Sequence, residues 1–212
     1  MSSIKVIALE GIHGVGKTTL MEKFKNLEKI NDYTIILLDE SFVKSPDTRL
    51  HPQKIVPEFI WAGNWFSRLL RFCHPYFDGK TGKYNGKIVV IADRSPYSAC
   101  VYPRDVSGIL LQPVIDSMVM QLRKDGVDVK IYYISDGKSK VMDRIKKRLE
   151  DPKESLRKKF TEDNEEWFNK VLKLYNVVKE SCKWETKTKD FKGGDEQYLK
   201  VLINKITTTT SN

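Results

Sequence analysis

The segment "GIHGVGKT", residues 11–18, follows directly on the apolar stretch "IKVIAL". Its glycines and its Gly-Lys-Thr ending match the pattern of a phosphate-binding loop between a strand and a helix. In such a loop the glycines let backbone N–H groups turn toward a phosphate, and the new helix adds its positive end. Residues 17–30 continue with apolar side chains at helical spacing. The segment therefore predicts a strand–loop–helix unit that binds a nucleoside triphosphate.

Two side chains of the loop have distinct expected roles. Lys17 reaches the β- and γ-phosphate oxygens, and Thr18 ligates Mg²⁺. His13 is unexpected in such a loop, and it either contacts a substrate or points off the loop. We expect the ATP-binding segment to consist of Gly11, Ile12, His13, Gly14, Val15, Gly16, Lys17, Thr18 and Thr19.

Nearly continuous apolar runs recur along the chain and are typical of strands buried on both faces of a parallel sheet. They cover Ile4–Leu9, Tyr33–Leu38, Ile88–Ala92 and Val129–Ile134, with a weaker fifth near 184–191. Helical spacing predicts helices over 54–73, 110–124, 138–149 and 164–180, with a closing helix over 195–206. Irregular segments are expected over 41–57 and 74–87, and a disordered tail over 207–212. The alternation predicts a single α/β domain over residues 1–206 with a parallel sheet.

The charge of the chain restricts its partners. The net charge is +9, and residues 136–159 hold ten Lys/Arg against five Asp/Glu, without an aromatic residue among them. A groove for single-stranded nucleic acid would interleave aromatic and basic residues. A bare basic helix favours closure over a triphosphate, so a nucleic-acid-associated module remains only a remote alternative.

The sequence predicts a cytoplasmic protein that does not enter a membrane. No apolar run approaches 18 residues, and the N-terminus lacks the pattern of a signal peptide. Three widely spaced cysteines, Cys73, Cys100 and Cys182, indicate neither a zinc site nor a disulfide framework.

Two carboxylates follow the second predicted strand. Asp39 and Glu40 end the stretch "LLDE", and ligands of a parallel sheet gather at the carboxyl ends of its strands. Either side chain is a candidate general base toward an acceptor hydroxyl, with Glu40 ahead of Asp39. The alternative is that both are solvated loop carboxylates.

Asp93 and Arg94 end the third predicted strand. The carboxylate can hold the water shell of Mg²⁺, and the guanidinium can bind phosphate or an acceptor oxygen. The alternative is a structural ion pair. Further along, Arg144 and Arg148 share one helix face and could clamp a transferring phosphoryl group, unless they are ordinary surface charges.

The segment "EFIWAGNWF", residues 58–66, is a candidate for the acceptor pocket. Trp61 could stack on a base and Asn64 could hydrogen-bond its edge. Aromatic residues at this spacing more often belong to a core.

These motifs resemble the deoxynucleoside kinases and thymidylate kinases, and most closely the herpesvirus-type thymidine kinases. His13 in "GIHGVGKTT" is similar to the viral form "DG-x-HG-x-GKTT". The segment "DRSPYSACVYP" is similar to "DRHP…SA…P", with Ser95 in place of histidine. The segment "DRIKKRLEDPKE" resembles the lid "DR-x-x-KR-x-RPGE", although Glu150 and Asp151 replace a further arginine. Glu40 matches the base of the family's "EP" motif, and the proline is replaced by serine.

The resemblance implies a homodimeric, ATP- and Mg²⁺-dependent kinase. It implies a three-layer fold with a five-stranded parallel sheet and a helical lid around residues 144–159. The γ-phosphoryl group would pass to the 5′-hydroxyl of a deoxynucleoside, with thymidine as the first candidate. Glu40 would take or orient the hydroxyl proton and Arg94 would lie near the attacking oxygen. The remaining cations of the site, namely Lys17, Arg144 and Arg148, would neutralise charge on the phosphoryl group.

A thymidylate kinase is the alternative within the same resemblance. The segment "WAGNWF" is similar to its "FSANRW" motif, but the arginine that would hold the monophosphate of the acceptor is absent. Arg68, one helical turn later, could replace it. A nucleoside has no phosphate to hold, so the departure favours a nucleoside acceptor.

Overall fold

The computed structural model places six strands in one sheet, in the order β2-β3-β4-β1-β5-β6. The structure describes residues 4–25, 27, 29–30, 32–40, 55–77, 87–103, 106–151, 163–188, 202 and 204. Its strands are β1 (Ile4–Glu10), β2 (Lys29–Ile30), β3 (Tyr33–Leu38), β4 (Lys87–Asp93), β5 (Val127–Ser135) and β6 (Glu185–Thr188). The pairs β3–β4, β4–β1, β1–β5 and β5–β6 are parallel, and only the two-residue β2 runs antiparallel to β3. The expected α/β fold with five parallel strands is confirmed.

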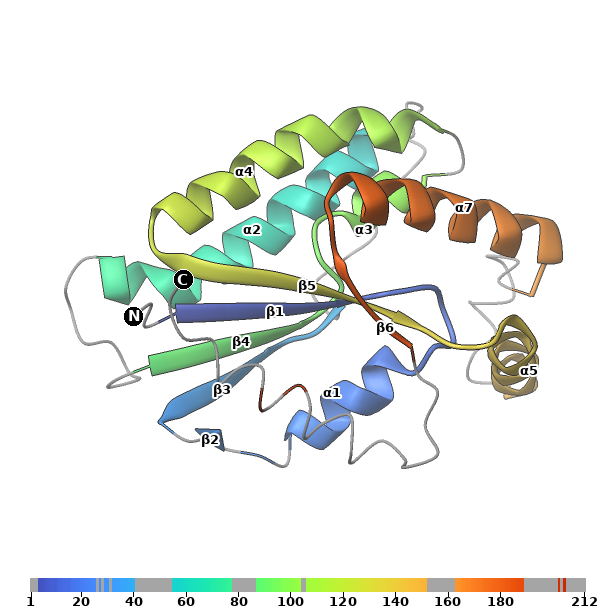
Figure 1. Ribbon diagram of the computed structural model, residues 1–212, viewed down its shortest axis with the longest axis horizontal. Helices are drawn as coiled ribbons and strands as arrows, with labels where there is room; N and C mark the ends of the chain where they lie inside the picture. Colours follow the sequence, from blue (N-terminus) through green and yellow to red (C-terminus); the bar gives the residue numbers. More distant parts are fainter. Residues whose placement is uncertain are drawn as a thin grey trace.

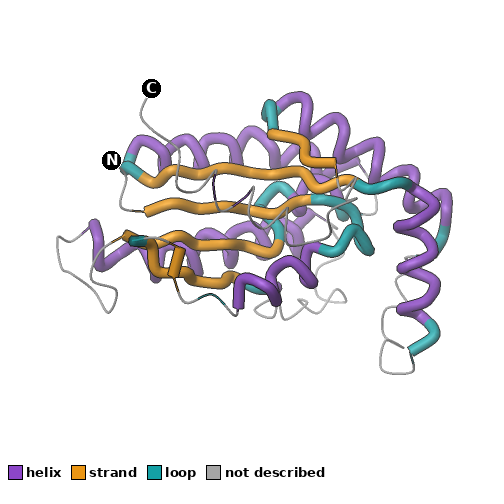
Figure 2. The backbone as a smooth tube through the Cα atoms, turned by 60° about the horizontal axis from the view of Figure 1, so that its bottom comes forward, coloured by secondary structure: helices purple, strands orange, loops and turns teal. Residues whose placement is uncertain are grey.

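Helices pack on both faces of this sheet. Within the described residues, the helical elements are α1 (Lys17–Lys25), α2 (Ile55–Phe77), α3 (Ser98–Val101), η2 (Val106–Leu111), α4 (Gln112–Lys124), α5 (Lys138–Leu149) and α7 (Glu165–Ser181). Figure 1 shows α2 and α4 side by side on one face and α1 on the other. In Figure 2, α5 stands beyond the ends of the strands rather than along a face. No helix within the described residues has the length and apolar character needed to cross a bilayer.

The core explains why the central strands are apolar throughout. Every residue of β1 is buried, and six of the seven residues of β4 are buried as well. Leu9 pairs with Asp93 in the parallel register, so both strands end at the same edge. Side chains at these ends therefore lie close together, as parallel topology requires.

The first helix is shorter than its sequence pattern predicts. It ends at Lys25, and Lys29–Ile30 form β2 instead of a further helical turn. Ile30 pairs with Tyr33 and is buried, so tertiary burial prevails over local helical spacing.

The irregular segments are also shorter than expected. Residues 55–57 and 74–77 belong to α2, and residue 87 begins β4. The rest of these segments, 41–54 and 78–86, lies outside the described residues, as do residues 152–159 of the expected lid and the tail 207–212. Within the expected closing helix, Leu202 and Asn204 are the described residues, and both are helical.

Candidate functional site

The loop between β1 and α1 depends on glycines for its shape. Gly11 and Gly14 have φ values of +145° and +79°, which L-residues rarely adopt. A Cβ atom on Gly11 would also collide with the carbonyl oxygen of Ile134 on β5. The loop thus passes so close to β5 that position 11 has no room for a side chain.

Lys17 bends back over this loop from the first turn of α1. Its Nζ donates to the carbonyl oxygens of Gly11 at 2.7 Å and Ile12 at 3.2 Å. Burial, and then the nearby Arg94 cation, lower the pKa of Lys17 to about 7. A phosphate chain would replace these two carbonyl contacts with oxygens that carry full negative charge.

Thr18 and Asp93 form the part of the site that suits a divalent cation. The Thr18 hydroxyl donates to Asp93 Oδ2 at 3.0 Å. The other carboxylate oxygen, Oδ1, is buried and has no hydrogen-bond partner in the described part of the chain. Burial raises the pKa of Asp93, and a bound cation would offset that cost.

The donor set fits Mg²⁺ held partly by its substrate. Among the described residues there is no group of three or more His, Cys, Asp or Glu side chains suited to a metal. Mg²⁺ is commonly held by one or two protein ligands, with phosphate oxygens and water completing its shell. One hydroxyl and one carboxylate beside a phosphate loop match that mode of binding.

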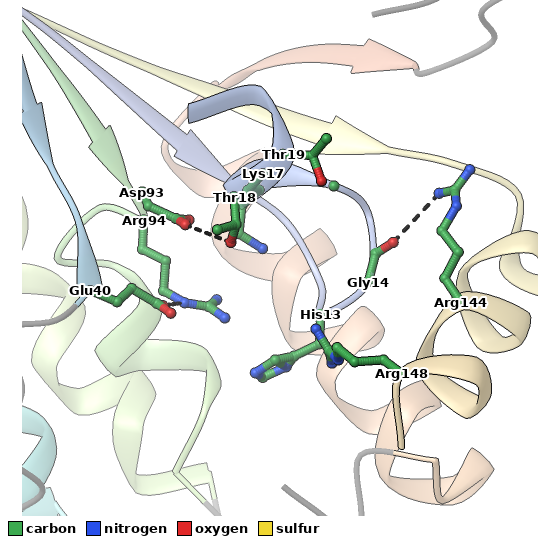
Figure 3. Close-up of a pocket in the computed structure, with 11 residues that line it drawn as sticks. His13, Gly14, Lys17, Thr18, Thr19, Glu40, Asp93, Arg94, Arg144 and Arg148 are labelled. Carbon is green, nitrogen blue, oxygen red and sulfur yellow. Dashed lines mark hydrogen bonds and ion pairs between the residues drawn. The ribbon is translucent and has the colours of Figure 1, made fainter. Parts of the chain in front are cut away.

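Glu40 and Arg94 meet across the ends of β3 and β4. The Arg94 guanidinium forms an ion pair with the Glu40 carboxylate and lies over the Tyr102 ring, 4.6 Å from its centroid. The Arg94 side chain is only 8% exposed, whereas that of Glu40 is 40% exposed. Figure 3 shows this pair facing the Thr18–Asp93 pair. A candidate base therefore lies next to the phosphate loop and opens toward solvent.

The Arg94 backbone is held in an unusual conformation. Its φ is +75°, outside the range that arginine favours. Its N–H donates to the carbonyl of Leu9 at 3.0 Å, and its own carbonyl accepts the Trp65 indole N–H at 3.1 Å. Trp65 thus supports the site from α2, a role that its sequence position did not reveal.

Glu10 is a buried carboxylate that sequence reasoning missed. Its Oε1 accepts from Ser95 N at 2.7 Å, Ser95 Oγ at 2.6 Å and Ser98 Oγ at 2.9 Å. Its Oε2 accepts from the Tyr175 hydroxyl at 2.8 Å. One side chain therefore joins the start of the phosphate loop, the segment after Arg94 and helix α7.

His13 lies in an aromatic cluster beside the loop. Its ring centroid is 4.7 Å from that of Tyr102 and 5.6 Å from that of Trp167. The structure thus places this loop residue between the segment after β4 and helix α7.

All five of the expected catalytic residues line one cavity of about 200 Å³. Its lining consists of His13, Gly14, Gly16, Lys17, Thr18, Thr19, Glu40, Asp93, Arg94, Arg144 and Arg148. Figure 3 shows that these side chains come from the loop, from the ends of β3 and β4, and from α5.

The expected acceptor residues on α2 lie outside this lining. Trp61 is partly buried and packs against the core, and Asn64 is exposed. Arg68 Nη1 donates to the Asp39 carbonyl at 3.1 Å and lies 3.5 Å from Asp39 Oδ1. Arg68 therefore contacts the residue that precedes Glu40 in the chain, but it is not part of the cavity lining.

Of the comparisons with known proteins, the one with solved structures finds a similar fold. No family model and no curated protein sequence matches this chain. Among solved structures, the fold is similar to that of polyphosphate kinase 2 from Arthrobacter aurescens TC1, with a TM-score of 0.58 and 14% sequence identity. The match covers 96% of this chain but 66% of that protein, slightly less than two thirds of its length. The chain thus shares the α/β fold of that protein.

Proposed function

We propose that this protein transfers the γ-phosphoryl group of Mg²⁺-bound ATP to the 5′-hydroxyl of a deoxynucleoside, with thymidine as the first candidate. The observation that carries the proposal is that one cavity is lined by both the phosphate loop and the candidate acceptor base. Lys17 and Thr18 stand on its donor side, and Glu40 with Arg94 stands opposite them. A simple ATPase needs no such carboxylate–arginine pair beside its phosphate loop.

The chemistry proposed for these residues is positioning and charge stabilisation. A 5′-hydroxyl entering the cavity donates its hydrogen bond to Glu40, which accepts the proton as the new O–P bond forms. The bond between the γ-phosphorus and the bridging oxygen breaks in the same step, and ADP leaves with that oxygen. Arg94 holds Glu40 in place and faces the attacking oxygen. Lys17 and Arg148 face the phosphate oxygens that gain charge. Mg²⁺ at Thr18 and Asp93 would neutralise charge on the β- and γ-phosphates.

A deoxynucleoside monophosphate is the second candidate acceptor. Arg68 favours it, because its guanidinium lies against Asp39, adjacent to the base Glu40. An arginine at this position could turn to hold the acceptor's phosphate. If it does, Arg68→Ala raises KM for dTMP and leaves KM for thymidine unchanged.

An acceptor panel separates these possibilities. ADP release from MgATP is measured with thymidine, the other deoxynucleosides and dTMP side by side. Polyphosphate with ADP, monitored by ATP formation, is a further arm, because the protein that shares the fold has polyphosphate in its name. The proposal expects turnover with a deoxynucleoside. Turnover with dTMP alone, or with polyphosphate alone, contradicts it.

Replacement of the base tests the mechanism. Glu40→Gln should lower kcat by at least 100-fold, because the amide cannot accept the proton, while the Kd for MgATP stays close to that of the parent protein. Glu22→Gln makes the same chemical change on the exposed face of α1 and should leave both values unchanged. Retained turnover in Glu40→Gln would remove Glu40 from the role of base.

A further inference from the structure

Helix α5 packs directly on the phosphate loop at Gly14. A Cβ atom on Gly14 would come within 2.8 Å of Ile145 Cγ1 and 3.2 Å of the Val141 carbonyl oxygen. Ile145 and Val141 are both buried and lie on one face of α5. The loop and α5 can therefore pack this closely only because residue 14 is a glycine and has no side chain.

A second contact between helix and loop involves Arg144. Its Nη1 lies 2.7 Å from Asp136 Oδ2 and 3.5 Å from the Gly14 carbonyl oxygen. Figure 3 shows Arg144 extended toward this carbonyl, while Arg148 extends from the same helix toward His13. The two arginines thus differ in what they face, although both line the cavity.

Asp136 fixes Arg144 from outside the cavity lining. It follows the end of β5, its side chain is 4% exposed, and its Oδ1 accepts the Gly137 N–H at 2.8 Å at the start of α5. Burial opposes ionisation of this carboxyl, but the Arg144 hydrogen bond and the Gly137 N–H outweigh it and lower the pKa of Asp136. The Asp136 carboxylate is thus kept in its charged form beside the Arg144 guanidinium.

The Gly14 carbonyl matters because of the peptide bond that it belongs to. The described peptide bonds are trans, so the Gly14 C=O and the Val15 N–H point in opposite directions. A guanidinium that attracts the carbonyl outward, toward α5, turns the following N–H toward the inside of the loop. Inward N–H groups are what such a loop offers to phosphate.

We propose that Asp136 and Arg144 are positioning residues that hold the phosphate loop in its binding conformation, and that Arg148 is the cation of α5 that faces the transferred phosphoryl group. The proposal refines the expectation that Arg144 and Arg148 act together as one clamp. It rests on the proposed function only in its choice of nucleotide, because any phosphate chain would depend on the direction of the loop N–H groups.

The test measures the Kd for MgATP and for inorganic tripolyphosphate by calorimetry, together with kcat. Asp136→Asn and Arg144→Ala should each weaken both ligands by about tenfold, the size expected for one charge-assisted hydrogen bond. Asp136→Asn should add little in the Arg144→Ala background, because Asp136 acts only through Arg144. Arg148→Ala should instead lower kcat by about 100-fold or more and leave the Kd nearly unchanged.

Matched controls exclude a general loss of structure or charge. Asp143→Asn and Lys147→Ala make equivalent changes at exposed positions of α5 and should leave both Kd values as in the parent protein. Urea unfolding of each variant shows whether the helix remains folded.

Three results would overturn the proposal. One is an unchanged Kd in folded Asp136→Asn, and another is additive losses in the double variant. The third is an Arg144→Ala protein that binds MgATP normally but loses kcat, which would return Arg144 to the catalytic clamp. Absence of transfer to any acceptor, with normal ligand binding, would instead refute the proposed function and leave this test intact. A parent protein that binds neither ligand would refute both.

Discussion

Lys17 shows how a single residue can be set for its task before a ligand arrives. Its ammonium group is buried, shares two loop carbonyls, and lies near the Arg94 cation. Burial disfavours the charged form, and the neighbouring cation disfavours it further. The Asp93 and Glu10 carboxylates compensate only in part. Phosphate oxygens would restore full compensation, so binding and protonation of Lys17 should be coupled.

This coupling predicts proton uptake when MgATP binds. The free lysine, with a pKa of about 7, is mostly neutral at pH 8, whereas bound phosphates hold it charged. Calorimetry at pH 8 in buffers of different ionisation enthalpy should therefore detect uptake of roughly one proton, and the Kd should rise by up to about tenfold per pH unit above 7.

Lys17→Arg is the control for this effect. Arginine stays charged throughout this pH range, so the Kd of this variant should not depend on pH in the same way. Equal uptake in the parent protein and in Lys17→Arg, or none in the parent, would contradict the role given to the lysine.

The sequence predicts those site residues that lie in the loop motif or directly after an apolar strand. It does not reveal a site residue whose role depends on distant parts of the chain. Lys17, Thr18, Asp93 and Arg94 were predicted because a loop pattern or an apolar run marks their positions. Glu10 was missed because its partners are 85 to 165 residues away in the chain. It does carry the same signal as Asp93, a carboxylate directly after an apolar strand.

At the scale of elements, the local sequence pattern predicts the middle of a helix or strand better than its ends or its contacts with other elements. The helix expected over 138–149 forms as predicted, because its apolar face packs on the loop and its charged face is solvated. The predicted end of α1 was wrong because Ile30 pairs with Tyr33 of β3, a contact that helical spacing cannot show. The packing of α5 on Gly14 was equally inaccessible, since it depends on where the two elements meet.

Three glycine substitutions separate backbone strain from packing. Gly14→Ala should destabilise the fold through both strain and collision with Ile145, and it should also weaken MgATP binding. Gly126→Ala shares the positive φ, at +88°, but meets no atom within 4 Å, so only strain of about 1–2 kcal/mol applies. Gly63→Ala, in α2 with open space around it, should stabilise the protein by about 0.5–1 kcal/mol.

Urea unfolding and calorimetry measure these effects. The order of stability should be Gly63→Ala above the parent protein, then Gly126→Ala, then Gly14→Ala, with nucleotide affinity lost only in the last. Equal losses at positions 14 and 126 would show that the helix–loop packing adds nothing.

At the scale of the whole molecule, topology assembles the site and charge decides its partner. Parallel strands in the order β3-β4-β1 bring Glu40, Asp93 and the phosphate loop to one edge, although they are distant in sequence. Of the net charge of +9, the segment 136–159 supplies +5. Its described part includes α5, and two arginines of this helix, Arg144 and Arg148, line the cavity.

This arrangement predicts that a nucleotide, not nucleic acid, stabilises the fold. A ligand at about 100 times its Kd adds roughly 2.7 kcal/mol to the free energy of unfolding. For a chain of this size, MgATP should therefore raise Tm by about 5–10 °C. A single-stranded or duplex oligonucleotide at the same charge concentration in 0.15 M salt should change Tm little. In Lys17→Ala the MgATP effect should largely disappear, because the phosphate chain loses its main cation. A steep salt-dependent stabilisation by DNA, with none by MgATP, would instead make the basic segment a nucleic-acid surface.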